Sequence, residues 1–170
     1  MGTRWGVRRS LLGIYLNDHL AAAMTCADAA RRLARAEADW AGNGKLERLA
    51  EEIEQDRAAL LQIMASLGEP VRRVEIWAGW AAAKLGRANL NGRVVTRSPL
   101  SRVVELEAMR LGIEAKVAGW RTLRARASAD PRLDTGRLDE LIAAGRSQIT
   151  RLERLRSRAA AELFGAGEPG

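Results

Sequence analysis

The sequence predicts an all-α protein: a four-helix bundle with a long, helix-containing crossover between the second and third helices. Three observations lead to this prediction. Apolar residues recur every three or four positions along four separate stretches, which is the period of an amphipathic helix. The composition is rich in the helix formers Ala, Leu, Arg and Glu. Glycine and proline gather between the stretches. A chain of 170 residues has the size of one domain, and we expect its core over residues 10–164.

The first helix is expected from about residue 10 to about residue 40, and the second from residue 46 to residue 67. Gly42 and Gly44 end the first and Gly68 ends the second, because glycine adopts left-handed backbone without steric cost. The inward positions of the first helix are Leu12, Leu16, His19, Ala23, Cys26, Ala30 and Leu33. Those of the second are Leu46, Leu49, Ile53, Asp56, Leu60, Ile63 and Leu67.

Residues 71–88 predict a shorter helix, and residues 89–98 predict a loop. The shorter helix could cover one face of the bundle with its apolar residues Ile76, Trp77, Trp80 and Leu85. A helix of this length rises about 27 Å, which is close to the length of the bundle. We therefore expect the crossover to return the chain to the end at which the second helix starts.

The third helix is expected from residue 99 to about residue 127, and the fourth from about residue 135 to residue 164. Ser98 supplies a capping hydroxyl, and Pro99 stands where its missing N–H does no harm. Asp130 and Pro131 separate the two helices. Because the loops within each pair are short, the first helix should lie antiparallel to the second and the third antiparallel to the fourth.

Two antiparallel pairs joined by a long crossover resemble the ferritin-like superfamily over about residues 10–164. Members with a di-metal centre place a Glu on each of two helices and Glu-x-x-His on each of the other two. The resemblance implies a metal-binding protein or an oxidoreductase, but this ligand pattern is missing. The single histidine is His19, and Leu16 stands three residues before it. The sequence therefore predicts no metal and no cofactor, and a surviving metal site would have to use His19, Asp56, Glu107 and Glu114.

Polar residues at the inward positions are expected to form salt bridges in the interior. The predicted polar core consists of Asp56, Arg110, Glu114, Arg146 and Gln148. Counting outward from the turn near residue 131 places Glu114 level with Gln148 and close to Arg146, and leaves Arg110 to face Asp56 or Glu107. A buried carboxylate is costly unless it is paired. We therefore expect Asp56 to be buried, ionised and held by an arginine, with Arg110 as its partner.

The leading functional hypothesis is a non-catalytic, cytoplasmic bundle that binds a protein partner or itself, most simply as a homodimer. Cys26 is the single cysteine, which excludes an intrachain disulfide and a thiolate zinc site. The sequence contains no Ser-His-Asp arrangement and no glycine-rich phosphate loop. It also lacks an apolar run long enough for a membrane span or a secretion signal. The ferritin-like metal protein is the first alternative.

The second alternative is a protein that binds nucleic acid or another anionic surface, because the net charge is +7. Residues 70–98 hold six basic groups and one acidic group, and Arg151, Arg154, Arg156 and Arg158 follow on the fourth helix. Two facts speak against it. Only three of the 28 basic residues are lysine, an arginine excess that GC-rich bacterial genomes produce. Residues 41–69 hold three basic and six acidic groups, so the opposite charges can complement each other within the protein.

Elemental analysis of the protein purified without added metal is expected to find no stoichiometric iron, manganese or zinc. The reason is the single histidine and the missing Glu-x-x-His pattern. One or two transition-metal ions per chain would contradict this expectation, and would identify carboxylates of the second and third helices as ligands.

Overall fold

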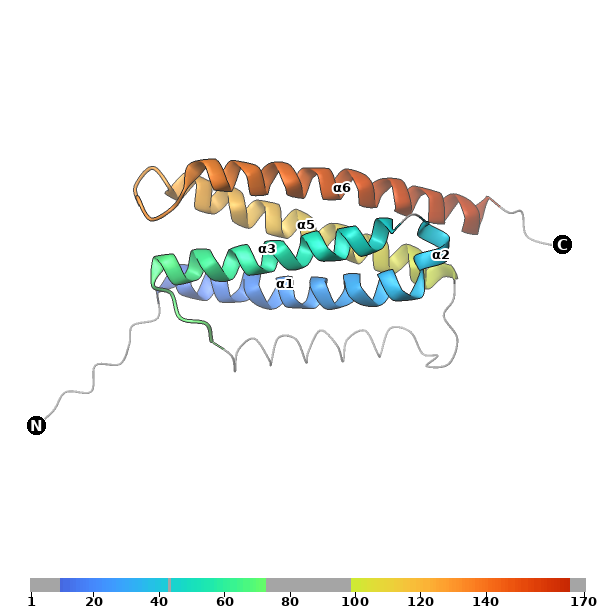
Figure 1. The fold of residues 1–170 in the computed structure, drawn as a ribbon, viewed down its shortest axis with the longest axis horizontal. Helices are drawn as coiled ribbons and strands as arrows, with labels where there is room; N and C mark the ends of the chain where they lie inside the picture. The colour runs from blue at the N-terminus through green and yellow to red at the C-terminus, as the bar shows by residue number, and fades with distance from the viewer. Residues whose placement is uncertain (1–9, 43, 73–98, 166–170) are drawn as a thin grey trace, which may run out of the picture.

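The computed structural model describes residues 10–42, 44–72 and 99–165. Its helices are α1 (Leu11–Ala36), α2 (Ala38–Ala41), α3 (Lys45–Leu67), α5 (Pro99–Arg126) and α6 (Thr135–Phe164). The four long helices pack as two antiparallel pairs, α1 with α3 and α5 with α6, and the pairs meet where α1 lies against α5 (Figure 1). This confirms the predicted all-α class and the pairing of the helices. None of the helices in the described part of the chain combines the length and apolar character needed to cross a membrane.

Local signals set most of the helix ends. Ser10 caps α1, since its Oγ accepts a hydrogen bond from the Gly13 N–H at 2.7 Å. Asp134 caps α6 in the same way, accepting from the Arg137 N–H at 3.0 Å. Gly68 ends α3 with a left-handed φ of 70°. These three ends agree with the sequence prediction.

The first helix is shorter than predicted, because the chain leaves helical geometry at Glu37 and continues into the four-residue α2. The Glu37 carboxylate is buried and accepts a hydrogen bond from Arg102 Nε of α5 at 2.7 Å. Arg102 in turn lies over the ring of Trp40, whose Nε1 donates to Glu162 of α6 at 2.5 Å. The break in the helix thus coincides with contacts to two other helices.

Contacts at the two ends of the bundle show that α3 finishes at one end and that α5 starts at the other. The C-terminal end of α3 lies beside the loop between α5 and α6, because Arg132 donates to the Leu67 carbonyl oxygen at 2.9 Å. Asn17 of α1 also lies there, and its side chain bonds the Pro70 carbonyl oxygen and the Arg72 N–H. The start of α5 lies at the opposite end, as Arg102 and Figure 1 show. Val71 and Arg72 are not helical, and the rest of the predicted crossover helix, with Trp77 and Trp80, falls outside the described residues.

The α5–α6 pair packs closely at one glycine. Gly145 of α6 is buried against α5, and a Cβ atom added there would lie 2.4 Å from Val117 Cγ2. Real Cβ contacts are never so short, so the helices would have to separate or Val117 would have to move. Glycine is therefore required here by the neighbouring side chain, although it weakens the helix itself.

Replacing Gly145 with Ala is expected to lower the free energy of unfolding by about 1–3 kcal/mol, the usual cost of overpacking a well-packed interior. Gly136→Ala is the matched control on the same helix, because its Cβ would meet only Asp134 Oδ1 at 3.4 Å. The control should raise the free energy of unfolding by about 0.4–1 kcal/mol through helix propensity and chain entropy. Urea unfolding of both variants measures the difference. If both variants changed the free energy of unfolding by the same amount, close packing would not be the role of Gly145.

Candidate functional site

Three polar side chains from three helices meet in the interior of the bundle. Lys116 of α5 donates from its Nζ to Asp56 Oδ2 of α3, and also to Gln148 Oε1 of α6 at 2.6 Å. Gln148 Nε2 donates to Asp56 Oδ2 at 2.9 Å, which closes a triangle. The side chains of Asp56 and Lys116 are only 6% and 12% exposed. We call these three residues the polar triad.

Asp56 and Gln148 were both expected inside, but the prediction that Arg110 holds Asp56 is wrong. The cation beside Asp56 is Lys116. Six residues separate the two candidates on α5, which amounts to about 9 Å of rise and a third of a turn around the axis. That rotation places Arg110 toward the outside of the α5–α6 pair instead. The available signal was that Lys116 stands between Ile113 and Val117 in an apolar stretch.

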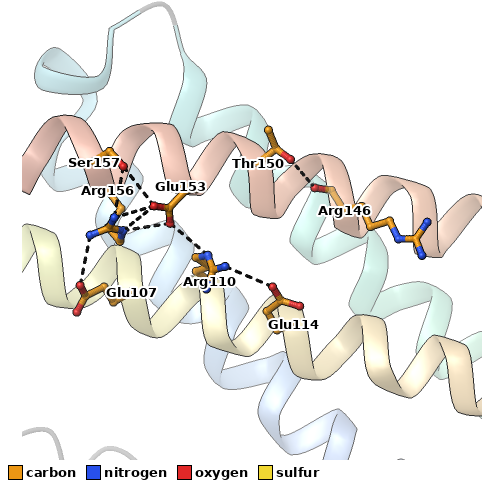
Figure 2. Close-up of polar contacts among 8 residues, drawn as sticks. All are labelled: Glu107, Arg110, Glu114, Arg146, Thr150, Glu153, Arg156 and Ser157. Carbon is orange, nitrogen blue, oxygen red and sulfur yellow. Dashed lines mark hydrogen bonds and ion pairs between the residues drawn. The ribbon is translucent and has the colours of Figure 1, made fainter.

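Arg110, Glu114 and the metal candidate Glu107 lie on the outer side of the α5–α6 pair and belong to a chain of ion pairs (Figure 2). Arg110 lies 3.2 Å from Glu153 and 3.6 Å from Glu114. Arg156 lies 2.7 Å from Glu153 and 3.7 Å from Glu107. Pairs of this exposure contribute about 0–1 kcal/mol each. They hold α5 to α6 at the surface and do not belong to the interior.

Arg146 was predicted close to Glu114, but it takes no part in this chain of ion pairs. Its side chain is exposed and points away from the other labelled residues in Figure 2. Only its carbonyl oxygen is engaged there, accepting from Thr150 Oγ1 at 3.1 Å. Arg146 is therefore a surface residue of α6.

A small cavity of about 30 Å³ adjoins the polar triad between α1, α3 and α5. Its lining includes His19, Cys26, Asp56, Lys116 and Trp120. A cavity of this size has room for about one water molecule, whereas pockets for small ligands measure about 300–1,000 Å³. This cavity can therefore accommodate water but not a substrate.

The two potentially reactive side chains at this cavity are both held in their neutral forms. Burial lowers the pKa of the His19 imidazole, against the opposing effect of Asp18. His19 packs edge-on against Tyr15, with the ring centroids 4.5 Å apart. Burial also raises the pKa of the Cys26 thiol to about 11, although nearby Lys116 acts in the opposite direction. Because the thiolate is the reactive form of cysteine, this environment keeps Cys26 inert.

The geometry of the triad also bears on metal binding. No group of three or more His, Cys, Asp or Glu side chains is placed to hold a metal ion in the part of the chain that the structure describes. Of the four candidates from the sequence, Asp56 already contacts the Lys116 ammonium, and Glu107 and Glu114 lie in the outer ion pairs. His19 lines the cavity from α1. The structure thus has four main helices in antiparallel pairs but does not bring these four candidates together.

The outward face of α5 is apolar, although its inward face already packs in the core. Leu100, Val104 and Leu111 are 49%, 50% and 65% exposed, and they lie on one side of the helix with the exposed Ala108 and Ala115. We call these five residues the α5 stripe. The remaining large apolar side chains that are exposed in the described residues, Leu11, Val71 and Phe164, lie at the ends of the bundle.

The basic residues of the second functional alternative are divided between two faces. The basic segment 73–98 lies outside the described residues. Of the four arginines between residues 151 and 158 of α6, Arg156 belongs to the outer ion pairs. Arg151, Arg154 and Arg158 instead line a groove shared with the beginning of α3.

Comparison of the chain with protein-family models, with curated proteins and with solved structures finds no match. Function is therefore inferred from the geometry of the described residues.

Lys116→Met is expected to lower the free energy of unfolding by about 3–5 kcal/mol, because it leaves the Asp56 carboxylate buried without its cation. Asp56→Ala should cost a similar amount by leaving the ammonium unpaired. The double variant Asp56→Leu with Lys116→Met should be much milder than the sum, since no buried charge then remains. Urea unfolding of the three variants and the unchanged protein gives the coupling free energy between Asp56 and Lys116.

Arg110→Ala is the matched control, since it removes a cation of the same helix from half-exposed ion pairs. It should cost about 0–1 kcal/mol. If Lys116→Met cost no more than this control, the polar triad would not be a strongly coupled interior network.

Proposed function

We propose that this protein is a non-catalytic helical-bundle module that associates with a second copy of itself through the α5 stripe. The observation that carries this proposal is the exposure of Leu100, Val104 and Leu111 along one face of a helix whose other face fills the core. A helix face that carries large apolar side chains is normally covered by another surface. A contiguous exposed apolar face is typical of a protein–protein interface.

The surroundings of the stripe resemble the edge of an interface. The outer ion pairs of Arg110 and Arg156 run beside it on the α6 side (Figure 2). Interfaces commonly combine an apolar centre with a polar, partly hydrated rim. The ion pairs of Arg110 with Glu114 and Glu153 would supply part of such a rim.

The order of residues along the stripe favours a second copy over an unrelated partner. When two α5 helices are placed antiparallel with the two-fold axis between residues 107 and 108, Val104 lies opposite Leu111 of the other copy. The same register places Leu100 opposite Ala115, so a large side chain meets a small one. Self-complementarity of this kind is the requirement of a two-fold symmetric interface.

The ferritin-like alternative has the arrangement of the helices in its favour, together with the predicted crossover helix over residues 71–88. No contact among the described residues adds support to metal or redox chemistry. The Lys116 ammonium lies between Asp56 and Gln148 in the interior, and a cation there already satisfies the buried carboxylate. We therefore rank self-association first.

Sedimentation velocity at several protein concentrations tests the proposal. The protein should shift from monomer to dimer as the concentration rises. Val104→Glu combined with Leu111→Glu should weaken the association by about 100-fold or more, because each protomer would bury two unpaired carboxylates in the interface. Both positions are exposed in the single chain, so the helical circular dichroism should stay unchanged.

Leu11→Glu is the matched control, because Leu11 is 85% exposed but lies at the start of α1, away from the stripe. It should leave the dimerisation constant unchanged. A protein that remains monomeric at all concentrations, or a dimer that the double variant leaves intact, would refute self-association through α5.

A further inference from the structure

A groove of about 390 Å³ lies between the beginning of α3 and the second half of α6. Five basic side chains line it: Lys45, Arg48, Arg151, Arg154 and Arg158. Its lining includes no acidic residue, and two leucines, Leu49 and Leu155, form its apolar floor. The groove is separate from the α5 stripe, which lies on another helix of the bundle.

Only part of the positive charge in this groove is neutralised by the protein. Arg151 pairs with Glu52 of α3, and the guanidinium holds the pKa of that carboxyl below its usual range. Arg158 pairs with Glu162 at 2.8 Å and also lies over the ring of Trp40. In the stretches 10–42, 44–72 and 99–165, no carboxylate lies within ion-pair distance of Lys45, Arg48 or Arg154. Three like charges therefore remain around one concave opening.

Helix electrostatics do not account for these positions. Lys45 is the first residue of α3 and Arg48 follows in its first turn, where the helix dipole disfavours positive charge. Gly44 precedes them with a left-handed φ of 61° and provides no side-chain cap. On α6, Arg154 lies ten residues before the end of the helix, beyond the last turn in which the dipole favours a cation. Each position is unfavourable or neutral for the fold, so a bound anion would relieve the repulsion.

The shape and chemistry of the groove together select a class of ligand. Arg151, Arg154 and Arg158 stand three and four residues apart, so they face the same side of α6 over about 10 Å of rise. Guanidinium groups bind phosphate with paired hydrogen bonds. A volume of about 390 Å³ lies in the range of small-ligand pockets.

We propose that this groove is a binding site for a small ligand that carries two or more phosphate groups. The uncompensated Lys45, Arg48 and Arg154 bind the phosphates, and the leucine floor contacts whatever apolar part the ligand has. Because the three cations come from both walls of the groove, affinity should rise with the number of linked phosphates.

Isothermal titration with inorganic phosphate, pyrophosphate and tripolyphosphate, at one fixed ionic strength, tests this proposal. Affinity should increase along the series. Arg48→Ala and Arg154→Ala should each weaken tripolyphosphate binding about tenfold, the loss expected for one charge-assisted contact. Both arginines are exposed, and thermal unfolding without ligand should stay nearly unchanged in either variant.

Arg146→Ala is the matched control, because Arg146 is an exposed arginine on the same helix, two turns before Arg154 and outside the groove. It should leave the affinity for tripolyphosphate unchanged. The Val104→Glu and Leu111→Glu double variant should also bind normally, which separates this site from the proposed self-association.

Three results would overturn the proposal: equal affinity for all three phosphates, an equal loss in the Arg146 control, or no binding of tripolyphosphate. Polyglutamate and a single-stranded oligothymidylate are titrated in parallel. Tighter binding of either one, lost in the Arg48 and Arg154 variants, would assign the groove to an acidic protein segment or a nucleic-acid strand instead.

Discussion

The contact of one lysine with one aspartate and one glutamine ties three helices of this bundle together. Asp56, Lys116 and Gln148 form hydrogen bonds to one another, and Asp56 and Gln148 are buried. Such a network adds little net stability, because the cost of removing the charges from water offsets their attraction. It does penalise misalignment. Sliding α3 by one turn, about 5.4 Å, would leave a carboxylate and an ammonium buried without partners. We infer that the triad selects the register of α3, α5 and α6.

The fourth long helix, α1, is positioned by shape more than by charge. It packs against α5 where that helix presents glycine: a Cβ on Gly119 would lie 3.0 Å from the His19 ring, and one on Gly112 would lie 3.3 Å from Cys26 Sγ. The two glycines leave room for the imidazole and the thiol at the cavity beside the triad. Close contact removes both groups from water, which explains why His19 and Cys26 have pKa values shifted toward their neutral forms.

With the interior occupied in this way, the surfaces offer the sites for partners. The outer ion pairs of α5 and α6 neutralise each other at the surface, as Figure 2 shows. Two other surfaces remain unbalanced: the apolar stripe of α5, and the basic groove between α3 and α6. Large apolar side chains are exposed on the first, and among the described residues three of the five cations of the second have no carboxylate within ion-pair distance. These two surfaces carry the proposed self-association and the proposed phosphate binding.

The sequence by itself determined the helices, because the three-to-four-residue period and the signals at Ser10, Gly68 and Asp134 act within a few residues along the chain. It also placed Asp56 and Gln148 inside, since both interrupt apolar positions. The partner of Asp56 was decided only by the tertiary structure. Lys116 and Arg110 are both cations on one helix, and choosing between them requires the rotation and offset of α5 relative to α3 to within a fraction of a turn.

The basic groove depends on the same kind of information. Arg151, Arg154 and Arg158 share a face that the sequence can predict, but Lys45 and Arg48 lie about a hundred residues earlier in the chain. The early end of α1 likewise coincides with a contact between helices, since the Glu37 carboxylate accepts a hydrogen bond from Arg102 of α5. Local interactions specify where each helix begins and ends and which of its faces is apolar. Contacts between helices depend on how their surfaces interlock, and that packing is a property of the whole fold.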